Sequence, residues 1–228
     1  METIFMEFEE FKSEIESTDK AEILEFEFGF EKYTKSELNS MNEINQERYG
    51  FNLSEDDIQI LAIDSESVLR WELLNNETEV FGGFRLIGIP AAISMKKFKV
   101  QVYNEDLDAD TAEILAKASY FDIMPGLESK VATIVTINEV THTLDLWYLN
   151  DSKVEKILLS PIQYINALFR VKGFFHWQYL FCDIKNVKKN IESREKESIL
   201  KIKKFLPEAF PGINHEYIIG RVDKLINN

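Results

Sequence analysis

Residues 157–183 read ILLSPIQYINALFRVKGFFHWQYLFCD, and this stretch carries the clearest helix signals in the chain. Ser160 is placed as an N-cap, Pro161 takes the first helical position, and Gln163 stands three residues after the cap. Apolar residues then recur at helical spacing until Gly173, a residue type that commonly ends helices. The pattern predicts a helix with one apolar face between Pro161 and Gly173, followed by a dense aromatic segment.

The chain before this helix is rich in strand patterns. In AEILEFEFGFEKY (21–33), Leu24, Phe26, Phe28 and Phe30 alternate with polar residues or glycine, which predicts an edge strand with one buried face. β-Branched and aromatic runs predict further strands. They are VLRWELL (68–74), EVFGGFRLIGI (79–89), KFKVQVY (97–103), VATIVTI (131–137) and LDLWYL (144–149). Two adjacent glycines, Gly82 and Gly83, indicate a bulge or tight turn in the second of these.

Helical patterns flank this strand-rich middle. Near the N-terminus an amphipathic helix carries Phe5, Phe8, Phe11 and Ile15. Further predictions are a helix with a Thr34–Glu37 capping box that ends at Gly50, a short helix after Ser54 and Asp57, one over 111–119, and a final exposed helix over 187–206. The order predicts a single α+β domain over residues 1–228, with a largely antiparallel central sheet between N-terminal and C-terminal helices.

The composition is that of a globular protein that needs no disulfide bond to fold. The chain has 228 residues, of which 45% are hydrophobic and 29% charged, and its single cysteine cannot form an internal disulfide. Its longest uncharged stretch, residues 157–169, is too short to span a bilayer. The N-terminus reads METIFMEFEEF and lacks the basic region of a signal peptide. These features predict a cytoplasmic protein with no membrane association.

Charge is distributed unevenly along the chain. Residues 1–79 contain 22 acids and 6 bases, whereas residues 151–228 contain 9 acids and 14 bases. The acidic front half repels phosphate backbones and argues against nucleic-acid binding. Two interpretations remain: a solvated surface that maintains solubility, or a surface that steers a basic protein partner.

No catalytic or metal-binding signature is present in the sequence. The three histidines lie at least 34 residues apart, the single cysteine has no CxxC partner, and no GxSxG or phosphate-loop motif occurs. Cys182 lies in FFHWQYLFCDI, which predicts a buried inert thiol; on a helix, His176 would point away from it. We therefore predict a protein that is not an enzyme and has no metal or cofactor; an enzyme without a recognisable motif is the alternative.

Three segments within residues 40–214 together resemble the SUKH superfamily, in the branch related to the fungal cell-wall-synthesis regulator. They are NEINQERYGFNLSEDDIQILAIDSES (42–67), VFGGFRLIGI (80–89) and a longer region from LDLWYLN (144–150) to FLPEAFPGIN (205–214). The last includes Ser160, Tyr164, Lys172–Gly173 and WQYLF (177–181). Ser54 stands where the family commonly has proline.

The resemblance implies a protein-binding α+β domain. Many bacterial members look like immunity proteins, which bind and neutralise a cognate toxin domain. An acidic chain suits a basic, nuclease-type toxin as its protein partner. From charge density we expect the partner contacts to be Asp56, Asp57, Asp64, Glu66, Glu77 and Glu79. The alternative is a regulatory or scaffolding protein-binding module without a toxin partner, as the fungal relatives suggest.

Overall fold

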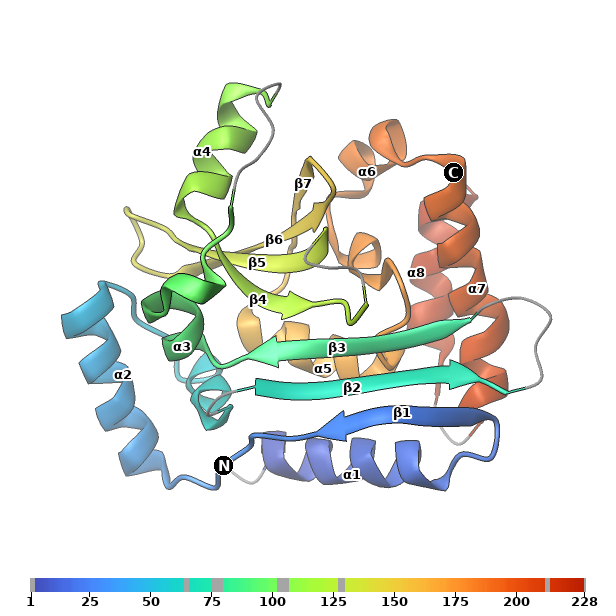
Figure 1. The fold of residues 1–228 in the computed structure, drawn as a ribbon, viewed down its shortest axis with the longest axis horizontal. Helices are drawn as coiled ribbons and strands as arrows, with labels where there is room; N and C mark the ends of the chain where they lie inside the picture. The colour runs from blue at the N-terminus through green and yellow to red at the C-terminus, as the bar shows by residue number, and fades with distance from the viewer. Residues whose placement is uncertain are drawn as a thin grey trace.

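The computed structural model describes residues 3–63, 66–74, 80–101, 107–126, 130–211 and 214–227. In these ranges seven strands form one antiparallel sheet whose spatial order follows the chain (Figure 1). The strands are β1 (Ala21–Glu27), β2 (Glu66–Leu73), β3 (Phe81–Ile87), β4 (Ser119–Ile123), β5 (Val131–Ile137), β6 (Leu144–Asn150) and β7 (Lys153–Lys156). The predicted α+β class, with helices flanking an antiparallel sheet, is confirmed.

Helices cover both faces and the ends of this sheet. The α-helices are α1 (Thr3–Ser17), α2 (Lys35–Tyr49), α3 (Ile89–Ser94), α4 (Ala109–Lys117), α5 (Pro161–Val171), α6 (Ile184–Asn190), α7 (Ser193–Ala209) and α8 (Glu216–Ile226). Short 3₁₀ helices are η1 (Asp57–Ala62), η2 (Lys96–Phe98) and η3 (Trp177–Phe181). In Figure 1, α2 lies at the left of the molecule, and α7 and α8 lie at the right.

The sheet separates a large core from a small one. Along β5, Val131 and Val135 belong to the large core, which also contains residues of α1, α5, α7 and α8. Ala132 and Ile134 point to the other face, where they pack with Leu115 of α4. This alternation is the period-two pattern of a strand buried on both sides.

The first strand lies at the sheet edge, as predicted, but its pattern is interrupted. Ile23 pairs with Trp71 and Glu25 pairs with Arg70, so the register shifts at Leu24. The Leu24 side chain is 42% exposed, and the prediction that it faces the core is wrong. A bulge adds one residue to a strand and breaks the alternation of its faces there.

The two adjacent glycines of β3 lie in an uninterrupted ladder with β2, so the predicted bulge or turn is wrong. They are required for close packing instead. A Cβ on Gly82 would lie 2.4 Å from the Trp71 ring. On the other side, the backbone of Gly173 meets that of Gly83, whose N–H donates to the Gly173 carbonyl at 2.9 Å. The end of α5 therefore crosses the strand in direct backbone contact.

Locally encoded helix signals are confirmed. The Thr34 and Glu37 capping box begins α2, and Gly50 ends it in the left-handed conformation. In α1, Phe8, Phe11 and Ile15 are buried. At the start of α5, the Ser160 N–H donates to Gln163 Oε1 at 3.0 Å.

Two predicted elements differ from the structure. The segment 97–103 is not a strand over its described part: it begins with η2, and β4 takes the place beside β3. Val102 and Tyr103 lie outside the described residues. The single helix predicted over 187–206 is two helices, because Ile191 turns into the core and Glu192 caps a new helix, its N–H donating to Glu195 Oε2 at 2.6 Å. The face of α7 that carries Ile199, Ile202 and Phe205 is buried rather than exposed.

Candidate functional site

The acidic residues of the front part lie on neighbouring elements. Helix α1 and strand β1 lie along the bottom of the molecule in Figure 1, and helix α2 lies at the left end of this side. Most of their acids are exposed: Glu9, Glu10, Glu16, Glu22, Glu27, Glu43 and Glu47. Because few bases are interspersed in this part of the chain, the side carries a strong negative potential.

Two adjoining cavities hollow this side between α1, η1 and α5. Their volumes are about 390 and 220 Å³, and Glu7 and Asn166 line both. We call the pair the acidic groove. Its other polar lining residues are Glu10, Glu14, Ser54, Asp56, Asp57, Gln59, Ser160, Gln163, Arg170 and Lys172. Carboxylate and amide oxygens dominate this lining, so the groove mainly offers hydrogen-bond acceptors.

The carboxylate of Glu7 lies at the junction of the two cavities. Burial raises the pKa of this group, with Arg170 opposing the rise and the neighbouring Glu10 carboxylate adding to it. In the same wall, the Oδ1 atom of Asn166 is buried without a hydrogen-bond partner among the described residues. Both groups are suited to accept hydrogen bonds from a cationic side chain.

Of the six acids expected to contact a partner, Asp56 is exposed at the groove and Asp57 is 9% exposed beside it. The Asp57 carboxylate is fully engaged within the protein. Its Oδ1 accepts hydrogen bonds from Ser160 Oγ at 2.7 Å and from the Ile162 N–H at 3.0 Å, and Oδ2 accepts from Ser54 Oγ at 2.7 Å. Asp57 thus caps α5 from a distant part of the chain, and it does not have the exposure expected of a partner contact.

Of the other four expected contacts, the structure describes only Glu66, which does not line the groove. Glu66 is half-buried at the start of β2, where its carboxylate lies 3.3 Å from Lys97 Nζ. Asp64, Glu77 and Glu79 lie outside the described residues. The acids that line the groove from α1 were missed, although Glu7, Glu10 and Glu14 occur at helical spacing and therefore share one face.

Buried titratable groups occupy the core rather than a surface site. Burial raises the pKa of the Cys182 thiol well above its usual value, and its Sγ donates to the Gln178 carbonyl at 3.4 Å. The His176 ring instead bonds Tyr148, with Nδ1 2.5 Å from the hydroxyl oxygen. Burial and the charge of Arg194 lower the pKa of His176 to about 4. The two side chains therefore have separate partners, and the thiol is held in its unreactive form.

A second buried acid lies in the centre of the sheet. Asp122 accepts hydrogen bonds from the Tyr164 hydroxyl at 2.5 Å and from the Arg85 N–H at 3.2 Å. Burial raises its pKa to about 6, although both hydrogen bonds oppose the rise. Across the described ranges no group of three or more His, Cys, Asp or Glu side chains is arranged to hold a metal ion.

Comparison with models of known protein families, with curated proteins and with solved structures finds no match. The resemblance to the SUKH superfamily therefore stays a prediction. Among the helices of the described residues, none has both the length and the apolar character needed to cross a membrane.

Proposed function

We propose that this protein is a cytoplasmic, immunity-type member of the SUKH superfamily that binds and neutralises a cognate basic toxin domain. Inhibition is stoichiometric: the toxin surface is covered and no bond is made or broken. The observation that carries the proposal is the acidic groove, a concave, acceptor-rich surface whose five carboxylates come from the acidic front part of the chain.

The surplus of acids acts first, while the partner is still at a distance. The charge of residues 1–79, with 22 acids against 6 bases, attracts a basic domain and orients it toward this side. Attraction of this kind raises the association rate and weakens as salt is added, because the screening length falls to about 8 Å at physiological ionic strength.

The groove then provides the short-range contacts. Lysine and arginine side chains from the partner would donate hydrogen bonds to Glu7, Glu10, Asp56 and the free Asn166 Oδ1. The carboxylates of Glu7, Glu10 and Asp56 then gain counter-ions from the partner, and the raised pKa of Glu7 returns toward its ordinary value.

The test has two stages. The purified protein is used to capture a partner from native lysate at low salt, and the partner gene is then expressed with and without this protein. We expect a basic partner that is toxic alone and harmless when the native protein is co-expressed. The variant Glu7→Gln/Glu10→Gln/Asp56→Asn should protect poorly. A control with the same charge change, Glu22→Gln/Glu43→Gln/Glu47→Gln, should protect almost fully.

The two stages also separate the alternatives. A tightly held partner without toxicity would contradict the immunity role and favour the regulatory or scaffolding module. Equal protection by both triple variants would show that the groove is not the binding site.

A further inference from the structure

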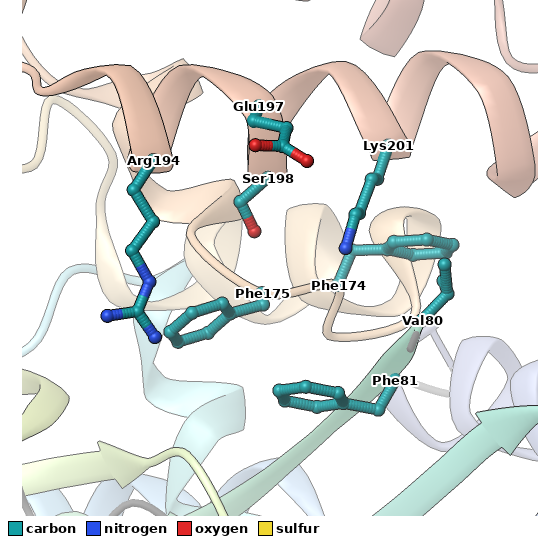
Figure 2. A pocket seen from close by; sticks show the side chains of 8 residues that line it. All are labelled: Val80, Phe81, Phe174, Phe175, Arg194, Glu197, Ser198 and Lys201. Carbon is teal, nitrogen blue, oxygen red and sulfur yellow. The ribbon is translucent and has the colours of Figure 1, made fainter. Parts of the chain in front are cut away.

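A separate cavity of about 250 Å³ lies between α7 and the segment that joins α5 to η3 (Figure 2). One side of it is aromatic. The ring centroids of Phe81 and Phe175 are 5.6 Å apart, with an angle of 31° between the ring planes. Both side chains are half-buried, whereas Phe174 behind them is buried in the core.

The other side of the cavity is a polar stripe of α7. Arg194, Glu197, Ser198 and Lys201 occur at positions that share one helix face. Figure 2 shows Arg194, Ser198 and Lys201 pointing from the helix toward the two rings. A cationic group and a hydroxyl thus face an aromatic surface across a small hollow.

Arg194 is exposed at one end of this stripe. Within the residues that the structure describes, its guanidinium makes no hydrogen bond and no ion pair. A guanidinium carries five N–H donors in a planar fork whose geometry matches a carboxylate. Its position at the rim of an aromatic hollow favours a ligand that is both anionic and flat.

A second cavity of about 380 Å³ adjoins the first and shares Phe175 and Arg194 with it. Two acids of its wall are already engaged. Glu192 pairs with Lys153, and Glu195 accepts hydrogen bonds from Asn150 Nδ2 and the Tyr179 hydroxyl. These acids therefore do not compete for Arg194.

The segment that carries the aromatic wall has an unusual backbone. Lys172, Gly173 and His176 have φ angles of 54°, 66° and 63°, so three of five consecutive residues are left-handed. Such a conformation is unfavourable for a residue with a side chain, and it is found preferentially in functional segments. Here it turns Phe174 inward and presents Phe175 to the cavity.

We propose that this cleft, formed by Phe81, Phe175, Arg194 and Ser198, binds an aromatic carboxylate. The ligand ring packs against Phe175 and Phe81, and its carboxylate accepts hydrogen bonds from Arg194 with the Ser198 hydroxyl beside it. The site is separate from the acidic groove and prefers an anionic ligand, whereas the groove prefers cationic side chains. Its size suits a ligand with one ring, either a free aryl carboxylate or the C-terminal residue of a peptide.

Titration calorimetry with 3-phenylpropionate, followed by amide chemical-shift mapping, tests the site. We expect the acid to bind at least about tenfold more tightly than 3-phenylpropanamide, because a charge-assisted hydrogen bond is lost with the amide. Acetate, which has no ring, should not bind. Arg194→Gln should weaken binding of the acid by about tenfold or more. Lys196→Gln removes the same charge from another face of α7 and should leave it unchanged.

Phe175→Leu keeps an apolar side chain in place and should weaken the acid and the amide alike. An acetylated dipeptide that ends in phenylalanine with a free carboxylate distinguishes the two kinds of natural ligand. Tighter binding of this peptide than of 3-phenylpropionate indicates a peptide C-terminus, and weaker binding indicates a small molecule. The proposal is overturned if the acid does not bind at concentrations up to about 10 mM. Equal affinity for acid and amide, or equal binding by Arg194→Gln and Lys196→Gln, would overturn it as well.

Discussion

The indole Nε1 of Trp71 donates a 2.7 Å hydrogen bond to the carbonyl oxygen of Lys172, 101 residues further along the chain. This bond joins β2 to the end of α5 at the place where Gly83 and Gly173 meet. Lys172 itself is buried, with its ammonium over the Phe11 ring and paired with Glu14 of α1. One crossing therefore connects the sheet, the central helix and the N-terminal helix.

The crossing makes glycine necessary at position 173 for a steric reason. Gly50 and Gly173 both have left-handed backbones, but only Gly173 has a neighbour: an added Cβ would lie 2.5 Å from the Gly83 oxygen. Gly50→Ala should cost about 1 kcal/mol, the conformational penalty alone. Gly173→Ala should cost about 3 kcal/mol or more, because the backbones must separate. Urea denaturation of both variants measures the difference, and equal losses would contradict the close approach.

The ion pair between Lys172 and Glu14 predicts a second contrast, within α1. Glu14→Gln leaves a buried ammonium without its counter-ion and should cost about 2 kcal/mol. Glu16, which lies 4.0 Å from Lys12, forms an exposed pair on the same helix. Glu16→Gln should change the free energy of unfolding by less than about 0.5 kcal/mol. Thermal or urea unfolding of the two variants at neutral pH compares them; a small effect of Glu14→Gln would mean that the ammonium finds another partner.

Asp56 and Asp57 should separate binding from stability. Asp57→Ala removes the acceptor for Ser54, Ser160 and the Ile162 N–H, and we expect a loss of about 2–3 kcal/mol. Asp56→Ala should cost less than about 0.5 kcal/mol, since its side chain is exposed. The association rate with a basic partner should show the opposite ranking of the two variants. Asp56→Ala should slow association, whereas Asp57→Ala should leave the association rate of the folded protein almost unchanged. A stability loss on substituting Asp56 would contradict this assignment.

Two buried groups predict opposite dependences of stability on pH. The pKa of Asp122 is about 6 in the folded state and its ordinary value is 3.8. The folded state therefore retains a proton that the unfolded state releases, and stability falls by about 3 kcal/mol as pH rises from 4 to 6. The pKa of His176 is about 4 against an ordinary 6.5. The stability that neutral His176 contributes is therefore fully present above pH 6.5. As pH falls toward 4, an amount similar to that of Asp122, about 3 kcal/mol, is lost.

In the native protein these two contributions largely cancel between pH 4 and 6. Relative to the native protein, Asp122→Asn should make stability rise more steeply with pH in this window. His176→Asn, which suits the left-handed backbone, should make stability fall with pH. The double variant should return to the native profile. Denaturant unfolding at several pH values measures the slopes, and single variants with the native slope would show that these groups do not titrate as described.

Elements with local signals could be predicted from the sequence, and those set by distant contacts could not. The capping box at Thr34 and Glu37 lies within one helical turn, so α2 was predictable. The bulge at Leu24 depends on the register with β2, and the break at Ile191 depends on burial in the core. Charge density identified an acidic surface in the front half. It did not distinguish Asp57, which caps a helix more than 100 residues away, from Asp56, which is exposed.

The order of the strands bears on how the protein folds. Because each strand pairs with its predecessor in the chain, the sheet can be extended one strand at a time as the polypeptide leaves the ribosome. Assembly by neighbouring segments keeps the entropy cost of closing loops low and favours rapid folding. Contacts between distant segments, such as that between Trp71 and Lys172, must wait for a part of the chain that is made much later. We expect this contact to form after the strands have paired and to fix the sheet against its central helix.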